Sequence, residues 1–243
     1  MKYGIFSDVH ANLEAFEAVL GELKKEKVDQ YVFLGDLVGY GADPKKCLEI
    51  LQDLITKGCL CVAGNHDHAA CGLLDIQYFN WAAKKAIVWT QSQLSRDEKD
   101  FLESLKLVDH EDDFSVVHAS LNEPQEWHYV DSQEDALPTF DLLKKRICFV
   151  GHTHRSIVFS FKNEVDFSLE KSFILKDPFK YIVNAGSVGQ PRDGNSQACF
   201  AVYDTQHRRV DIHRVSYDID TTQEKILAAG LPEILAYRLS MGQ

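Results

Sequence analysis

The most constraining feature of this sequence is a regular alternation of short apolar runs and amphipathic stretches over its first 67 residues. Apolar runs at 2–7, 31–34 and 59–62 have the length and composition of buried strands. Between them, residues 12–27 and 43–58 carry apolar side chains at helical spacing. Parallel strands joined by right-handed helical crossovers place their carboxyl ends on one edge of a sheet. The sequence therefore predicts an α/β core whose polar strand ends gather at one edge.

The ends of these strands, and of two later apolar runs at 114–117 and 147–150, hold residues able to bind metal. The candidate ligands are Asp8, His10, Asp36, Asn65, His118, His152 and His154. Imidazole nitrogens mixed with carboxylate and amide oxygens suit Mn²⁺, Fe, Zn²⁺ or Ni²⁺. Seven ligands are too many for one tetrahedral ion, but they suffice for two ions that share a carboxylate. Each residue alone has an ordinary explanation, such as helix capping, but their recurrence at five strand ends favours a metal site.

The rest of the chain changes in character twice. Residues 68–113 carry aromatic side chains at near-helical spacing and a capping-box pattern at Ser95 and Glu98, which predicts a helical insertion. Beyond residue 155 the apolar period falls to two, which predicts a largely antiparallel second sheet with strands at 156–162, 166–175, 181–184, 198–204 and 210–215. Asp43 before a proline predicts a capped helix start, and helices are expected near 222–240. Without a linker or repeat, we expect a single domain over 1–243.

Composition limits the possible partners. A formal net charge of −11 argues against a surface that binds nucleic acid. Bound cations would still make the chain receptive to a small phosphorylated substrate. Six cysteines without CxxC spacing favour buried free thiols. Residues 1–20 lack the basic segment followed by an apolar segment that is typical of a signal peptide. No apolar run approaches the ~20 residues that a membrane span needs. We therefore expect a cytoplasmic protein without a membrane partner.

The ordered motifs resemble the signature of one known family. The calcineurin-like metallophosphoesterases have a motif set similar to five parts of this chain: Asp8-Val9-His10, Gly35-Asp36 with Gly39, Gly64-Asn65-His66-Asp67, His118 and Gly151-His152-Thr153-His154. Ser7–Asn12 and Asn184–Arg192 look like the small prokaryotic phosphodiesterase branch of that family, whose members are often labelled diadenosine tetraphosphatase-like. The resemblance runs from residue 4 to about residue 193.

This resemblance implies a fold and a set of roles. The fold would be α/β (α+β), a four-layer αββα sandwich of two mixed β-sheets flanked by helices. A first divalent ion, with Mn²⁺ the leading candidate, would be held by Asp8, His10 and His154. A second ion would be held by Asn65, His118 and His152. Asp36 and a water or hydroxide would bridge the two ions, and His66 would be the catalytic histidine that faces the substrate phosphate.

The implied activity is two-metal phosphodiester hydrolysis of a small nucleotide-like substrate. A phosphomonoesterase and a dinucleoside polyphosphate hydrolase are alternatives, because they share the metal site. A non-catalytic binding module and a DNA nuclease also use this fold, but the presence of His66 and the negative charge disfavour them. Arg192, Tyr40 and Asn12 are candidate substrate contacts. Asp67 either orients His66 or forms the turn around it.

Overall fold

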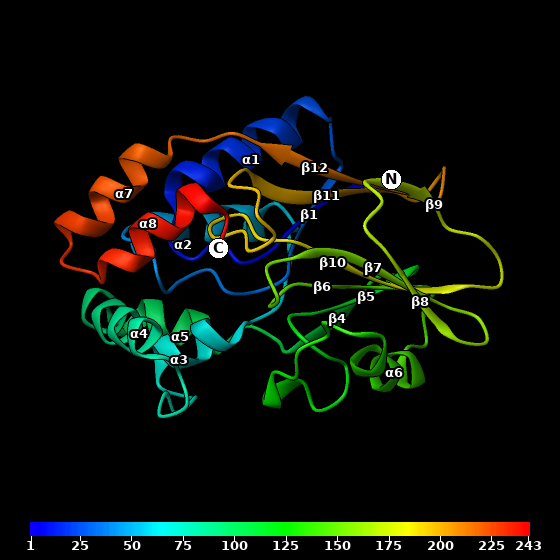
Figure 1. Cartoon of the computed structure of the whole chain (residues 1–243), viewed down its shortest axis with the longest axis horizontal. Helices are drawn as coiled ribbons and strands as arrows, with labels where there is room; N and C mark the ends of the chain where they lie inside the picture. Colours follow the sequence, from blue (N-terminus) through cyan, green and yellow to red (C-terminus); the bar gives the residue numbers. More distant parts are fainter.

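The computed structural model describes residues 1–243, and its frame is a pair of six-stranded sheets packed face to face (Figure 1). The first sheet contains, in spatial order, β3 (Leu60–Cys61), β2 (Gln30–Phe33), β1 (Lys2–Phe6), β11 (Ala198–Asp204), β12 (Arg209–Val215) and β9 (Ser172–Ile174). The second contains β4 (Val108–His110), β5 (Phe114–Val117), β6 (Ile147–Val150), β10 (Lys180–Ala185), β7 (Ser156–Phe161) and β8 (Val165–Ser168). Both sheets mix parallel and antiparallel pairs.

Helices cover both outer faces of this pair. The first sheet is covered by α1 (Leu13–Lys25) and α2 (Pro44–Thr56), and the second by α6 (Gln133–Leu142). The remaining helices are α3 (Asn65–Cys71), α4 (Trp81–Gln93), α5 (Arg96–Glu103), the 3₁₀ turn η1 (Pro124–Glu126), α7 (Ile219–Ala228) and α8 (Glu233–Met241). None of the helices is both long enough and apolar enough to span a membrane. The four-layer αββα sandwich of two mixed sheets is confirmed.

The strand sequences explain why each sheet is covered on both faces. Successive side chains of a strand point to opposite faces. In β1, Phe6 packs toward α1, while Ile5 packs into the layer between the two sheets. That inner layer also contains Phe114 and Phe149 from the second sheet, whose rings lie 5.5 Å apart. Because both faces of the central strands are buried, their sequences are nearly continuous apolar runs.

The predicted placement of the C-terminal strands was wrong. They do not form a separate antiparallel sheet: β11, β12 and β9 complete the first sheet, whereas β10, β7 and β8 complete the second. The single strand expected over 166–175 is two strands, β8 and β9, which lie at the edges of different sheets. The alternation of apolar and polar residues runs through 165–169 and breaks at Glu170-Lys171-Ser172, where the chain crosses between the sheets. The prediction of one strand overlooked this break.

Both helix starts predicted from capping patterns are confirmed, but only one of them is capped as expected. Ser95 and Glu98 form the expected capping box at the start of α5. Asp43 precedes Pro44 as expected, but its side chain caps nothing. Its carboxylate instead lies 2.7 Å from Nζ of Lys225, which also bonds to Glu14. This partly buried lysine therefore ties α7 to α1 and α2.

Candidate metal centre

The seven predicted ligands follow five strands, three in the first sheet and two in the second. Asp8 and His10 follow β1, Asp36 follows β2 and Asn65 follows β3. His118 follows β5, while His152 and His154 follow β6. The strands β1, β2 and β3 are parallel to one another, and so are β5 and β6. The ligands that follow them therefore lie at one edge of each sheet. The two edges meet, and the candidate ligands are drawn from both sheets.

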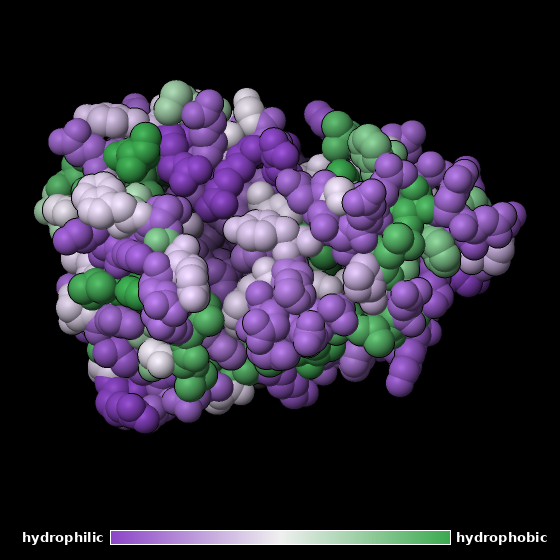
Figure 2. Space-filling view, turned by 60° about the horizontal axis from the view of Figure 1, so that its bottom comes forward, coloured by the Kyte–Doolittle hydropathy of each residue, from purple (hydrophilic) through white to green (hydrophobic).

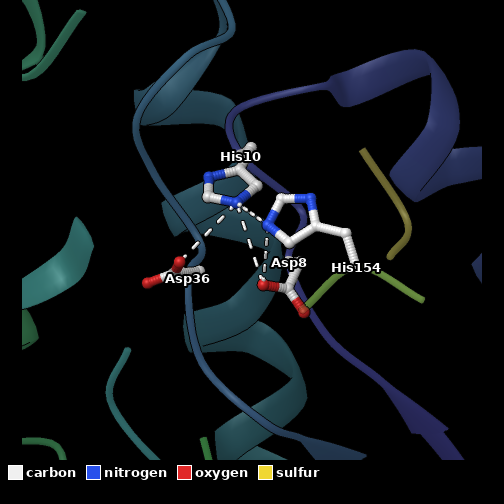
Figure 3. A group of neighbouring side chains, drawn as sticks. All are labelled: Asp8, His10, Asp36 and His154. Carbon is white, nitrogen blue, oxygen red and sulfur yellow. Dashed lines mark hydrogen bonds and ion pairs between the residues drawn. The ribbon is translucent and has the colours of Figure 1, made fainter. Parts of the chain in front are cut away.

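One cluster of ligand atoms is formed by Asp8, His10, Asp36 and His154, all within 4.8 Å of one another and all buried (Figure 3). Nε2 of His10 lies 3.1 Å from Nε2 of His154 and 3.6 Å from Oδ2 of Asp36. Nε2 of His154 lies 3.2 Å from Oδ1 of Asp8. Two imidazole nitrogens and two carboxylate oxygens therefore face a common point, as the ligands of a cation do.

A second cluster is formed by Asp36, His118 and His152. Nε2 of His118 lies 3.4 Å from Oδ2 of Asp36 and 3.2 Å from Nδ1 of His152. The same Asp36 oxygen thus faces both clusters. The other oxygen of Asp36 accepts a hydrogen bond of 2.8 Å from the backbone N–H of His66, which fixes the orientation of the carboxylate.

Main-chain oxygens set the orientation of three imidazoles. Nδ1 of His10, His118 and His154 lies 3.1, 2.8 and 2.6 Å from a backbone carbonyl oxygen. These carbonyls belong to Val38, Leu34 and Gln190. A ring whose Nδ1–H donates to a carbonyl presents the lone pair of Nε2 on its other side. Each Nε2 points into the clusters, so in the neutral Nδ1–H form all three rings present a lone pair to a cation.

Unpartnered buried atoms support the fit to metal ions. Oδ2 of Asp8 accepts from the backbone N–H of His152 at 3.1 Å, but its Oδ1 has no hydrogen-bond partner. Oδ1 of Asn65 is also buried without a partner. Leaving a buried oxygen unsatisfied costs about 1–3 kcal/mol, and a bound cation would remove that cost at both atoms. The donor set and its open positions therefore fit divalent ions.

The backbone at the site is unusual. Asp8, His10, Asp36, His152 and His154 all have a positive φ, between +50° and +67°. Residues other than glycine rarely adopt this region, and it costs roughly 1–2 kcal/mol for each residue. Such strain typically concentrates where a fold holds functional side chains in place. No sequence pattern indicated it.

Asp67 organises the loop that carries Asp36. Its carboxylate accepts hydrogen bonds from four backbone N–H groups, those of Gly64, Asp36, Leu37 and Val38, at 2.8–3.2 Å. Burial and the Asp36 charge raise the pKa of Asp67 to about 7, while these donors oppose the rise. Of the two roles left open by the sequence, the contacts favour the loop-forming one.

His66 belongs to neither ligand cluster. Its ring packs between aromatic neighbours, with centroids 4.5 Å from Tyr40 and 5.1 Å from Phe79, and its Nδ1 is buried without a partner. Gly39 makes room for this ring, since a Cβ there would lie 2.6 Å from Nδ1 of His66. Burial lowers the pKa of His66 to about 4. The imidazole is therefore neutral at pH 7 in the absence of a bound anion.

Neighbouring charges outweigh burial in setting the protonation of Asp36 and His118. Burial disfavours ionisation of Asp36, but His118 and His66 outweigh it and hold the pKa of Asp36 well below its usual range. Burial likewise disfavours protonation of His118, but the charges of Asp36 and Asp8 raise its pKa to about 9. A cation that binds here must therefore displace a proton from His118 at neutral pH.

The three candidate substrate contacts differ in their surroundings. Tyr40 packs against His10 and His66, and the guanidinium of Arg192 lies 5.7 Å from the centre of the Tyr40 ring. Asn12 is 2% exposed, its Oδ1 caps α1 and its Nδ2 donates to a main-chain oxygen. The amide of Asn12 is thus already used, which favours a structural role over the predicted substrate contact.

No sequence motif assigned the aromatic residues that border the site to it. The ring of Tyr129 lies 4.1 Å from that of His152 and is 55% exposed. Trp127 lies 5.9 Å from His118, and Phe79 lies against His66. These rings come from the 68–113 region and from the loop after β5, which no motif covers. The only signal was a high local aromatic content.

Comparison with known proteins identifies the family of this chain. The family model of the calcineurin-like phosphoesterase superfamily domain matches residues 1–208. The chain belongs to this superfamily. An uncharacterised protein of Methanocaldococcus jannaschii is 38% identical over 245 residues, covering 98% of this chain and 97% of its own length.

Two solved structures have the same fold over the whole chain. The crystal structure of a metallophosphoesterase from Sphaerobacter thermophilus has a TM-score of 0.86 at 37% identity, with 100% of both chains covered. A hypothetical protein from Pyrococcus horikoshii OT3 has a TM-score of 0.82 at 18% identity, covering 100% of this chain and 98% of its own. The predicted family is confirmed, and the chain is a metal-dependent phosphoesterase of a two-metal family.

Proposed function

We propose that this protein is a two-metal phosphodiesterase that hydrolyses a small nucleotide-like phosphodiester. The observation that supports this most directly is the position of Asp36. Its Oδ2 lies 3.6 Å from Nε2 of His10 and 3.4 Å from Nε2 of His118, so one oxygen faces both ligand clusters. A carboxylate shared in this way suits two ions about 3.5–4 Å apart.

The residues divide into two ligand sets that share Asp36. We assign one ion to Asp8, His10 and His154. We assign the other to Asn65, His118 and His152. Bound ions would supply Lewis-acid activation of the attacking water and of the phosphate oxygens. Mn²⁺ is our leading candidate, with Fe, Zn²⁺ and Ni²⁺ as alternatives, because the set contains nitrogen and oxygen but no sulfur.

His66 is our candidate for the residue that acts on the phosphate. Its ring is held between Tyr40 and Phe79, and its Nδ1 has no partner within the protein. A nearby phosphate anion would raise the low pKa of this ring, since opposite charge favours the protonated form. Protonated His66 could then stabilise the developing negative charge or give its proton to the leaving alkoxide.

The surroundings of the centre favour a nucleotide-like substrate. Tyr129 presents a half-exposed ring beside His152, and Phe79 lies beside His66. Stacking of a base on an aromatic ring contributes roughly 1–3 kcal/mol. The face seen in Figure 2 is hollowed near its middle and mostly hydrophilic around the hollow, as expected for a polar ligand. We propose a cytoplasmic location, because all six cysteines are unpaired.

The test is hydrolysis of bis-p-nitrophenyl phosphate and of p-nitrophenyl phosphate by metal-reconstituted protein. We expect the diester to be the better substrate. Asp36→Asn should lower both metal content and kcat/KM by at least about 100-fold. Asp53→Asn is the matched control, because this carboxylate is 59% exposed in a surface ion pair. A protein that binds two ions but hydrolyses neither compound would refute the proposal, and a preference for the monoester would make it a phosphomonoesterase.

A further inference from the structure

Trp127 is the one buried tryptophan of this chain, and its indole N–H has no partner. The sequence contains three tryptophans. Trp81 is 64% exposed and Trp89 is half-buried, whereas Trp127 is 8% exposed. Nε1 of Trp127 is buried without a hydrogen-bond partner within the protein. Because an unpaired buried donor is costly, we expect its acceptor to be a group that the protein binds.

The ring of Trp127 lies beside the second ligand cluster. Its centroid is 5.9 Å from that of His118, a candidate ligand, and 5.2 Å from that of His68. Nε2 of His118 in turn lies 3.2 Å from Nδ1 of His152. The loop that carries Trp127 also carries Tyr129, whose ring lies 4.1 Å from that of His152. Trp127 and Tyr129 therefore both border this cluster.

The backbone around Trp127 adopts an unfavourable conformation. Trp127 follows the 3₁₀ turn η1 with a φ of +56° and a ψ of +37°, and Glu123 precedes that turn with a φ of +48°. Bulky residues rarely adopt this left-handed region. The buried Val130 anchors the far side of the loop in the core outside the second sheet. Strain that a fold retains in this way typically places a side chain for function.

The neighbouring acceptor atoms do not bond to this indole. Oδ1 of Asn65 and Nε2 of His152 belong to the same ligand set, and both are also buried without a partner. These two atoms can present lone pairs to a metal ion, but an indole nitrogen only donates and cannot bind one. Bound metal ions would therefore leave Trp127 unpaired. Its partner must be an acceptor that a further ligand brings to the centre.

We propose that Nε1–H of Trp127 donates a hydrogen bond to an oxygen of the substrate phosphate bound at the second ligand cluster. A phosphate brings oxygens that only accept, which matches a nitrogen that only donates. A hydrogen bond to a charged oxygen is stronger than one between neutral groups. Unlike lysine or arginine, the neutral indole makes this bond without repelling the metal ions. The inference rests on the proposed function and identifies a residue that contacts its substrate phosphate.

The experiment observes the indole N–H directly, by nuclear magnetic resonance of protein labelled with ¹⁵N-tryptophan. The protein is reconstituted with Zn²⁺, whose filled d shell makes it diamagnetic. Trp81→Phe and Trp89→Phe assign two of the three indole resonances, so that of Trp127 follows by elimination. Inorganic phosphate should move the Trp127 proton resonance downfield, as a hydrogen bond to a charged oxygen does, and leave the Trp81 resonance in place.

Two results would overturn the inference. One is a Trp127 resonance that does not respond to phosphate, although calorimetry shows that phosphate binds. The other is a full downfield shift on adding Zn²⁺ alone, which would make metal-bound water the acceptor.

The same measurement separates this inference from the proposed function. A downfield shift in a protein that hydrolyses no diester would mean that only the proposed function fails. Diester hydrolysis without a shift would mean that only the inference about Trp127 fails. A wild-type protein that binds no phosphate would overturn both.

Trp127→Phe removes the N–H and retains an aromatic ring. The Kd for inorganic phosphate should rise about tenfold or more, with the Zn²⁺ content unchanged. The kcat/KM for bis-p-nitrophenyl phosphate should fall by a similar factor. Trp81→Phe is the matched control and should change both values by less than about twofold, because Trp81 lies on the surface. Equal changes in the two variants, or an unchanged Kd in metal-loaded Trp127→Phe, would show that the hydrogen bond does not exist.

Discussion

Replacing Gly39 by alanine should separate the positioning of His66 from metal binding. Gly39 has a φ of +87°, and a Cβ added there would lie 2.6 Å from Nδ1 of His66. The next two nearest atoms, at 3.2 and 3.3 Å, also belong to His66. The methyl group would therefore press first on this side chain, which is not a candidate metal ligand.

The size of the effect follows from these distances. An ordinary contact of 3.4 Å would require Nδ1 of His66 to move by about 0.8 Å from its 2.6 Å separation. A misplacement of about 1 Å in a catalytic group can cost roughly 100-fold in rate. Alanine at a positive φ should also cost about 1–2 kcal/mol of unfolding free energy. We therefore expect kcat to fall about 100-fold, with both metal ions retained.

Gly72→Ala is the matched control for this experiment. Gly72 has the same φ of +87°, but nothing lies within 4 Å of the position of its missing Cβ. It should lose the same unfolding free energy in urea without a change in kcat. The assays are bis-p-nitrophenyl phosphate hydrolysis, metal analysis and urea unfolding. Full activity in Gly39→Ala, or loss of metal from it, would show that the reasoning about His66 is incorrect.

Three further predictions address the catalyst, the protonation of the centre and the C-terminal helices. His66→Gln should retain both ions in metal analysis but lose about 100- to 10,000-fold in kcat, and loss of an ion would make His66 a ligand. Because the charges around His118 raise its pKa to about 9, its proton competes with metal below that pH. Metal affinity measured by calorimetry should therefore rise between pH 7 and 9, with proton release, and a flat profile would contradict this. Lys225→Met removes the cation that Glu14 and Asp43 share, so the unfolding free energy in urea should fall by about 1–3 kcal/mol. Lys57→Met removes an exposed pair and should cost less than about 1 kcal/mol, and equal losses would refute the distinction.

Local patterns in the sequence were sufficient to predict that six of the candidate ligands lie close together: Asp8, His10, Asp36, His118, His152 and His154. Parallel strands deliver their ends to one edge, so Asp36, His118 and the other candidates could be grouped before any contact was known. The alternation of apolar and polar residues could not show which sheet each strand after residue 155 joins, because strands of both sheets have the same period of two. This explains the error at β8 and β9.

Features that depend on distant residues had no local signal. Asp43 has the sequence of a helix cap, but Lys225, far along the chain, binds its carboxylate. The positive φ of Asp8 or His154 arises from the packing of loops around the clusters, and neither residue type predicts it.

The central position of β1 has a consequence for biosynthesis. Although β1 precedes β2 and β11 in the sequence, it lies between them in the sheet, with Tyr3 opposite Tyr203. His154 likewise depends on the carbonyl of Gln190 for its orientation. A nascent chain on the ribosome therefore has an open strand edge until β11 emerges, and it cannot complete the metal centre before then. The complete and correctly oriented ligand set is thus available only after residue 190 has been synthesised.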